Sequence, residues 1–372
     1  MKKLCLFITV LCLCLALAPW CAAKASAEAP AADLDKAAST ALAALDRHIE
    51  EMRDNYCVYY DPDEYRLMMG DYAGSFGGVG VSMILGDDGY VTVYKVLDEG
   101  PAKDSPIKAG DRIIAVDGEN IVGQDTDQAA LRIRGEVGTP VTLTMLDADG
   151  EQYELTLVRQ EITTHSVEGD RVAERPDTAY IQISGFTGQT VREFGDEYNR
   201  LRAEGPIEWL ILDLRSNTGG NFYSAISLAE FFVPAQQTVV REKMAEGSTA
   251  YTSTSGMLRD VKLIVLQNEW TASASEVLAG ALRDEAGAVL IGSTSFGKGI
   301  TQVIQQMPSG GAWKYTHSRY YTPSGFDLHG VGLSPDIEVE TGDDMTAEDY
   351  YSLDPAKNPH LRSALDYIAS AD

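Results

Sequence analysis

The feature that most constrains the fold is an alternation of apolar runs with helix-forming segments between residues 179 and 292. The run EWLILDLRS at 208–216 is apolar over most of its length, as is typical of a strand buried on both faces. Further strands are expected at 179–186, 261–268 and 288–292, with helices at 190–201, 217–232 and 273–285. Strands that alternate with helices are joined by crossovers, so the sequence predicts an α/β core with parallel strands over residues 161–372.

The preceding region has a different pattern, with short alternating strands separated by Gly and Asp turns from residue 75 to residue 160. A hairpin is expected across Asp149-Gly150, and a short amphipathic helix at 126–135. These features predict a small β-rich domain of about five or six strands and one or two helices. Near the other end of the chain, the Tyr-rich alternating segment 311–325 predicts a hairpin.

The N-terminal residues have the pattern of a targeting segment. Lys2-Lys3, an apolar run and the small residues Ala25-Ser26-Ala27 predict a secretory signal peptide over residues 1–27, and therefore an exported protein, extracellular or in the cell envelope. An uncleaved segment that associates the chain with a membrane is the alternative, because the run is near the lower length limit for spanning. Residues 28–74 are expected to form a linker and a short helical segment, with the helix near 41–52.

Charge and cysteine content exclude several functions. A net charge of −26 argues against nucleic-acid binding, because an acidic surface repels phosphates. Four of the five cysteines lie in the expected signal peptide, which leaves Cys57, interpreted as a packed thiol, and no disulfide or cysteine metal cluster. The acidic segment 340–351 is interpreted as a solvated loop rather than a calcium site. No metal and no cofactor are therefore expected.

The segment GSTSFGKGITQ at 292–302 allows three roles for Lys298. A phosphate-binding loop would need Ser or Thr directly after the lysine and a helix beyond it, but Gly299 and a β-branched run follow. A Ser295-x-x-Lys298 acylation motif would need a helical turn, for which Phe296-Gly297 is a poor interior, and its companion motifs are absent from the sequence. The third role is that of a proton acceptor for a serine elsewhere in the chain.

The segment NEWTASASEVLAGAL supplies such a serine between the expected strand at 261–268 and the helix that follows. Backbone N–H groups at a helix N-terminus can stabilise a developing oxyanion. A lysine accepts a proton only when it is neutral, so its pKa must fall from about 10.4, and desolvation in an apolar pocket lowers it. Phe296, Ile300 and the apolar helix from Val277 are expected to form the walls of that pocket.

Residues 75–160 resemble a PDZ domain. The resemblance lies in Gly78-Val79-Gly80-Val81, in SPIKAGDRIIAVDGENI at 105–121 and in the helix that ends at Ile133-Arg134-Gly135. It implies that N–H groups of the loop formed by Gly78, Val79, Gly80 and Val81 receive the C-terminal carboxylate of a peptide, which adds a strand to the sheet edge. Glycine suits this loop, because a side chain would block the approach of an anion to the backbone.

Three segments in residues 161–372 resemble the carboxyl-terminal processing proteases, the S41 serine peptidases with a PDZ domain: TASASEVLAGALRD, SFGKGITQ and DLRSNTGG. The resemblance extends from about residue 40 to residue 340 and implies a crotonase-like core. It implies Ser273 as nucleophile, Lys298 as general base and Gln302 as the side chain that orients the lysine. The implied oxyanion hole comprises Ala274 with Gly219 or Gly220.

The function expected from these features is a secreted serine endopeptidase of the C-terminal processing type, which cuts protein or peptide substrates with a free C-terminus. A catalytically silent PDZ scaffold is the alternative from the binding class, and an acyltransferase or esterase is a further one. A Ser-His-Asp triad is not favoured, although His165, His317, His329 and His360 are present. Asp213 and Arg215 are interpreted as a structural ion pair, and Glu276 as a helix N-terminal acid that favours the dipole.

Overall fold

The computed structural model describes residues 56–86, 88–340 and 345–371. The expected signal peptide at 1–27 and the expected helix near 41–52 lie outside these residues. Contacts divide the chain into two units, Met1–Cys57 and Val58–Asp372, and nearly all described residues belong to the second. In the described ranges no helix has both the length and the apolar content of a membrane span, and no group of His, Cys, Asp and Glu is arranged to hold a metal ion.

The central sheet confirms the predicted parallel α/β core. Its order is β10-β11-β12-β15-β16-β19, and every neighbouring pair is parallel except β10 with β11. The bounds are β10 Val167–Arg171, β11 Thr178–Ile183, β12 Trp209–Asp213, β15 Lys262–Gln267, β16 Val289–Gly292 and β19 Ile337–Glu338. All five residues of β12 are buried, as the apolar run around it predicts.

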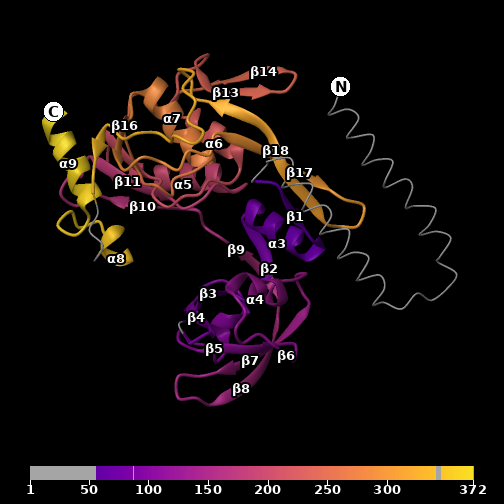
Figure 1. Ribbon diagram of the computed structural model, residues 1–372. Coiled ribbons are helices and arrows are strands. Elements are labelled where there is room, and N and C mark those ends of the chain that lie inside the picture. The colour runs from indigo at the N-terminus through magenta and orange to yellow at the C-terminus, as the bar shows by residue number, and fades with distance from the viewer. Residues whose placement is uncertain (1–55, 87, 341–344, 372) are drawn as a thin grey trace. The chain divides into compact units, whose positions relative to one another are not determined.

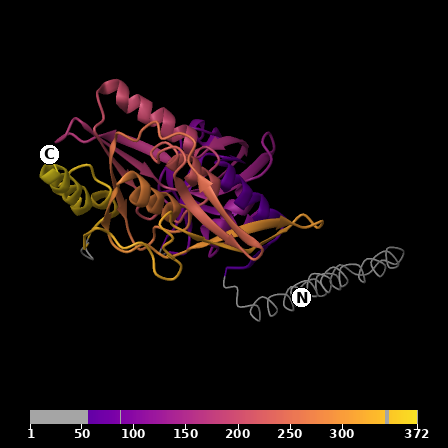
Figure 2. The ribbon, with the colours of Figure 1, turned by 90° about the horizontal axis from the view of Figure 1, so that it is seen from above.

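Helices cover both faces of this sheet (Figure 1, Figure 2). The helices α5 Thr190–Glu204, α6 Phe222–Ala229 and α7 Ala274–Ala286 share one apolar cluster with the strand residues Ile181, Leu212 and Val265. The helix α9 Pro359–Ala371 packs on the alternate residues Ile211 and Ile264. Because successive strand residues point to opposite faces, β12 and β15 contribute to both clusters.

A second sheet combines a strand that precedes the core helices with strands that follow α6 and α7. It contains β1 Val58–Tyr60, β13 Thr238–Met244, β14 Gly247–Thr252, β17 Ile300–Gln306 and β18 Ala312–Tyr321. The hairpin expected within 311–325 is wrong in its bounds, because residues 312–321 form the single strand β18, which pairs antiparallel with β17. The turn lies at Met307–Gly311, where the N–H of Met307 donates to the carbonyl of Gly311. The preceding β-branched segment therefore supplies the partner strand.

The region 75–160 forms the predicted β-rich structure with its own core. Its sheet has the order β3-β4-β5-β7-β8, and β6 pairs with β5. The core includes Val91, Ile113, Leu143 and Met145, all with no exposed surface. The strands are β3 Val81–Leu85, β4 Val91–Val96, β5 Arg112–Val116, β6 Glu119–Asn120, β7 Pro140–Leu146 and β8 Gln152–Val158, accompanied by the 3₁₀ helix η1 Pro101–Asp104 and the helix α4 Thr126–Ile133.

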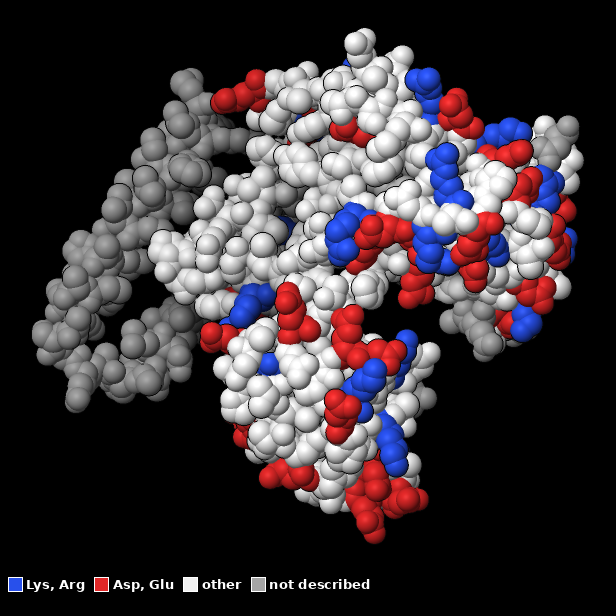
Figure 3. Space-filling model, turned by 180° about the vertical axis from the view of Figure 1, so that it is seen from behind, with Lys and Arg blue, Asp and Glu red and all other residues white. Residues whose placement is uncertain are grey.

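Short elements flank this region on both sides. Helix α3 Pro62–Ala73 begins after Asp61, whose carboxylate accepts from the N–H of Glu64. The strand β2 Ser75–Gly78 pairs with β9 Gln160–Thr163, and α8 spans Ala347–Tyr350. On the face shown in Figure 3, Lys and Arg side chains are interspersed with Asp and Glu, so this face has no continuous basic surface for a nucleic acid.

Candidate active site

Ser273 precedes the first turn of α7, after the loop that follows β15. Its backbone has φ 57° and ψ −117°, a conformation that a non-glycine residue rarely adopts and that costs about 1–3 kcal/mol. The N–H of Ser273 donates to Oε2 of Glu276 at 2.9 Å, which helps to hold this conformation. Strain of this kind is common where a side chain must be presented at a functional site.

Gly219 packs directly against the Ser273 backbone. A Cβ at position 219 would lie 2.9 Å from both Cβ of Ser273 and N of Ala274, and φ at this position is 105°. The N–H of Gly219 already donates to Oδ1 of Asn217 at 2.9 Å. Within the described part of the chain, the N–H groups of Gly220 and Ala274 donate to no protein acceptor. Of the two glycines, Gly220 is therefore the one with a donor free for a substrate oxyanion.

Lys298 lies between β16 and β17, close to the other residues implied by the motifs. Its Nζ donates to Oε1 of Gln302 at 3.0 Å. The structure places Ser273, Lys298 and Gln302 in the lining of one cavity of about 590 Å³, together with Gly219 and Gly220. Three segments therefore meet around this cavity: the turn between β15 and α7, the glycine turn after β12, and the hairpin formed by β17 and β18.

The surroundings of Lys298 lower its pKa. Burial is the largest cause, the positive charge of Lys314 adds to it, and the negative charge of Glu276 opposes both. Ile300 is 7% exposed and lines the cavity, as expected for an apolar wall. The expectation for Phe296 is wrong, because its side chain is 51% exposed. Ile300 therefore forms part of the apolar wall beside Lys298, and Phe296 does not.

Glu276 is the functional side chain whose role the sequence did not indicate. It is fully buried, and it accepts hydrogen bonds from the N–H groups of Ser273, Gly297 and Lys298 and from the hydroxyl of Ser295, at 2.5 to 2.9 Å. Burial raises its pKa, and these hydrogen bonds oppose the rise. Its interpretation as a helix-dipole acid was therefore incomplete, because the carboxylate connects the serine turn to the lysine segment.

Tyr320 of β18 makes a second connection between the same two segments. Its hydroxyl lies 2.9 Å from the carbonyl oxygen of Ser273 and 2.7 Å from that of Lys298, and its ring is buried. One phenolic proton is shared between two carbonyl acceptors. Burial is the main reason that the pKa of Tyr320 is raised, so the hydroxyl stays a donor.

Other candidate catalytic groups lie elsewhere. The structural ion pair is confirmed: Arg215 Nη2 lies 2.5 Å from Asp213 Oδ2, both side chains are fully buried, and Tyr180 donates to the same carboxylate. Arg215 also stacks on Tyr350, with 4.3 Å from its Cζ to the ring centroid. The cavity that contains Ser273 is lined by none of the four histidines considered in the sequence, His165, His317, His329 and His360.

The loop implied to bind peptides connects β2 to β3. Gly78 ends β2, Val79 and Gly80 form the turn, and Val81 begins β3. Val79 is 2% exposed and packs in the core of this region. Gly80 has φ 83°, and a Cβ there would lie 2.1 Å from the carbonyl oxygen of Glu99, so only glycine fits.

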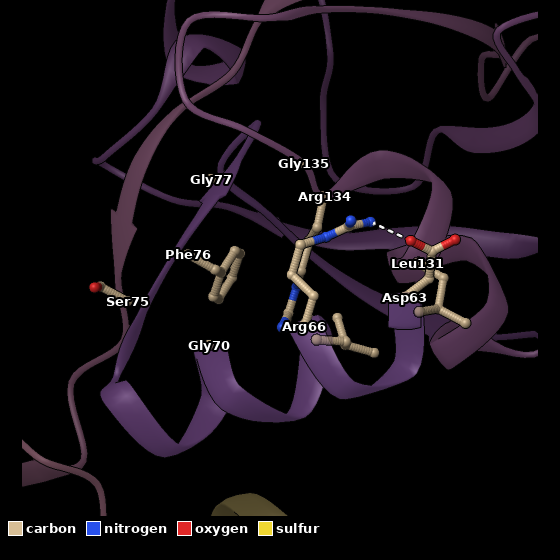
Figure 4. Close-up of a pocket in the computed structure, with 10 residues that line it drawn as sticks. Asp63, Arg66, Gly70, Ser75, Phe76, Gly77, Leu131, Arg134 and Gly135 are labelled. Carbon is tan, nitrogen blue, oxygen red and sulfur yellow. Dashed lines mark ion pairs between the residues drawn. The ribbon is translucent and has the colours of Figure 1, made fainter. Parts of the chain in front are cut away.

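A small cavity of about 190 Å³ lies beside this loop, between α3, β2 and the end of α4 (Figure 4). Phe76 and Arg134 both line it, and the guanidinium of Arg134 lies 3.5 Å from the centroid of the Phe76 ring. Arg134 also pairs with Asp71 at 2.7 Å. The dashed line in Figure 4 marks the pair of Asp63 and Arg66, at 2.8 Å. Arg134 thus joins the end of α4 to α3 and to β2, the strand that leads into the loop.

Comparisons with known proteins agree with these features. The model of peptidase family S41 matches residues 177–339, and that of the PDZ domain matches residues 71–146. A probable CtpA-like serine protease of Staphylococcus haemolyticus is 33% identical over 300 residues, 80% of this chain and 59% of that protein. A carboxy-terminal-processing protease of Bartonella bacilliformis is 34% identical over 293 residues, 77% of this chain and 67% of that protein.

A solved structure assigned to an S41 protease from Bacteroides fragilis is similar in fold, with a TM-score of 0.50 at 15% identity over 87% of this chain and 88% of that one. The chain spans only 59% of the length of the Staphylococcus haemolyticus relative. Sequence identity and family models together decide the family. The chain therefore belongs to peptidase family S41, the family of the carboxy-terminal-processing proteases, and carries a PDZ domain.

Proposed function

We propose that this protein is a serine endopeptidase of the C-terminal processing type, with Ser273 as nucleophile and Lys298 as general base. The observation that carries the proposal is the shared cavity: the two residues line it together, and the pKa of the lysine is lowered there. A serine hydroxyl is a weak nucleophile until a neighbouring group takes its proton, and a neutral amine can do so. The S41 family membership of the chain supports the same reaction.

The proposed reaction uses these groups in sequence. Neutral Lys298 takes the proton of Ser273, whose oxygen attacks the peptide carbonyl and forms a tetrahedral intermediate. The N–H groups of Ala274 and Gly220 stabilise the oxyanion. Lys298 then gives its proton to the leaving amine, and water attacks the acyl-enzyme to release the new carboxyl group. Gln302 keeps the amine in position through its 3.0 Å hydrogen bond and does not titrate.

We further propose that the PDZ domain presents substrates to this site. Two features support it: the tight glycine turn at Gly78-Val79-Gly80-Val81 and the match of residues 71–146 to the PDZ family. The free C-terminal carboxylate of the substrate would bind the N–H groups of that turn, and the peptide would extend β3. The charge and small-residue pattern of residues 1–27 supports export, with membrane association if that segment is retained.

The proposal is tested by substitution at the two central residues. Ser273→Ala is expected to abolish cleavage of an unfolded protein substrate and labelling by a serine-reactive phosphonate. Lys298→Arg is expected to be nearly as damaging, because arginine does not release its proton at working pH. Ser293→Ala serves as the control, since Ser293 lies outside the cavity and bonds Glu269. Full activity in Lys298→Ala would rule out the mechanism.

The same experiment separates the alternatives. A PDZ scaffold without catalysis would bind peptides through the loop at Gly78–Val81, but the phosphonate would not label Ser273. An esterase or acyltransferase would turn over an ester substrate and leave the protein substrate intact. We expect cleavage of the protein substrate and labelling at Ser273, both of which require the dyad.

A further inference from the structure

A second lysine lines the cavity that contains Ser273. Lys314 lies on β18, directly opposite Ile304 of β17 and Val58 of β1 in the strand register. Ile304 and Gln302 are two residues apart on β17, so their side chains share a face of the sheet, and both line the cavity with Lys314. The Lys314 side chain therefore borders the same space as the nucleophile, on the side of the hairpin formed by β17 and β18.

The charge of Lys314 is not balanced by a carboxylate in the described part of the chain, where no acidic group lies within 4.0 Å of its amine. Its Nζ lies 5.1 Å from the centroid of the Tyr60 ring. A ring face attracts the ammonium but accepts no full ion pair. Among the residues that line the cavity, the acidic one is Asp71, and it already pairs with Arg134 at 2.7 Å.

An unbalanced ammonium in a cavity of this kind is a binding group for anions. The protein as a whole has a net charge of −26, so a positive charge beside the nucleophile is a local exception. A carboxylate beside Lys314 would exchange water for a charge-assisted hydrogen bond in a partly desolvated space. Ile304 and Ile300 on the same hairpin supply the apolar surroundings that strengthen such a bond.

We propose that Lys314 is a specificity residue, which binds a carboxylate of the peptide substrate beside the scissile bond. The proposal rests on the proposed peptidase function of the same cavity and adds a preference for an acidic substrate there. The carboxylate has two possible sources, an Asp or Glu side chain near the cleaved bond or the free C-terminus of a short tail. Both present the same group to the ammonium.

The test uses the full chain and fluorogenic peptides that are cut at one bond. In one set of peptide pairs, one member has Glu and the other Gln at a single position flanking that bond. In a further pair, one peptide has a free C-terminus and the other an amidated one. We expect kcat/KM to be about tenfold higher for the acidic member of at least one pair, as for a charge-assisted hydrogen bond. Lys314→Gln should abolish that ratio, and Lys314→Glu should reverse it in favour of a peptide with Lys at the same position.

The ratio is taken within each variant, so a partial loss of folded protein cancels. Lys243→Gln is the matched control, since Lys243 is an exposed lysine of the same sheet that does not line the cavity, and it should keep the wild-type ratio. If Lys314→Gln still prefers the peptide with a free C-terminus, that preference comes from the PDZ loop. This result would contradict binding of the C-terminal carboxylate by Lys314. Equal ratios in wild type and Lys314→Gln for every pair would overturn it.

A binding measurement separates this proposal from the proposed function. In Ser273→Ala, fluorescence anisotropy reports peptide binding without cleavage. Tighter binding of the acidic peptide, lost when Lys314→Gln is added, supports the role of Lys314 even if the wild-type protein cleaves nothing. Cleavage of all peptides with no acidic preference in rate or binding would refute Lys314 as a specificity residue and leave the peptidase function standing.

Discussion

Replacing Glu276 by glutamine tests whether the buried carboxylate holds the nucleophile and the base in place. Each carboxylate oxygen accepts two hydrogen bonds, Oε1 from Ser295 and Gly297, and Oε2 from Ser273 and Lys298. In Glu276→Gln one oxygen becomes an NH₂ group, which faces donors on either side. The least costly orientation points this group at Ser295, whose hydroxyl rotates to accept and leaves the N–H of Gly297 unpaired.

The magnitude follows from these four contacts. A buried donor without a partner costs about 1–3 kcal/mol, and hydrogen bonds to a charged acceptor contribute about 1.5–3 kcal/mol against about 1 for neutral ones. Removing the buried charge of Glu276 offsets part of the loss, because burial disfavours the ionised form. We therefore expect the free energy of unfolding to fall by about 3 kcal/mol. A shift of the serine or lysine by about 1 Å would lower kcat about a hundredfold.

Urea unfolding measures the loss of stability, and kcat on one fluorogenic peptide measures the displacement of the catalytic groups. Glu269→Gln is the control, since Glu269 is exposed, lies in the loop that precedes α7 and accepts a hydrogen bond from Ser293. We expect it to change the free energy of unfolding by less than about 0.5 kcal/mol. If Glu276→Gln unfolds at the wild-type urea concentration and keeps wild-type kcat, the carboxylate does not hold the two segments, and the reasoning from its hydrogen bonds is refuted.

Two further substitutions test the neighbouring contacts. Tyr320→Phe removes the hydroxyl that bridges the carbonyls of Ser273 and Lys298, so kcat should fall about tenfold with little change in KM; unchanged kcat would contradict the bridging role. Gly219→Ala should lower kcat by at least about tenfold, because the new Cβ would lie 2.9 Å from Cβ of Ser273. Gly287 is the control, since it also has a positive φ but a Cβ there would meet no other atom. Gly287→Ala should lower the free energy of unfolding by about 1 kcal/mol and leave kcat unchanged. Equal kcat in both glycine variants would exclude the steric argument.

The parallel core and the strand-to-helix turn that carries Ser273 were predictable because their signals are local. The apolar run around Trp209–Asp213 is long enough to indicate a strand buried on both faces, and the small residues before α7 indicate a tight turn. The helix at 126–135 followed from its apolar spacing and is found as α4. These patterns span a few residues each and need no knowledge of the rest of the chain.

The supporting contacts were not predictable because they join residues far apart in sequence. Glu276 bonds a segment 19 to 22 residues away, and Tyr320 bonds a carbonyl 47 residues away. An acid three residues into a helix is also the ordinary pattern of a capping box, so its spacing alone does not indicate burial. The exposure of Phe296 was missed for the same reason, because the packing of a loop residue depends on which elements surround it.

The choice between the two glycines also depended on tertiary detail. Gly219 and Gly220 are equivalent in the sequence DLRSNTGG, and either could lend an N–H to the oxyanion. The structure distinguishes them through Asn217, whose side-chain oxygen occupies the N–H of Gly219. A local side-chain to backbone bond of this type is common for asparagine in turns, but sequence does not show which of several donors it selects.

The ionisation of Lys298 is the central claim, and it is measured most directly by competitive acetylation. Ser273→Ala protein is treated with trace acetic anhydride across a pH series, and mass spectrometry gives the reactivity of each lysine, which follows its neutral fraction. Because burial disfavours the charged amine, the pKa of Lys298 should lie below its ordinary value of 10.5. The neutral base then forms at a lower pH than in a solvated lysine, and kcat/KM should rise at that lower pH as well. A pKa of 10.5 or above for Lys298 would contradict the account.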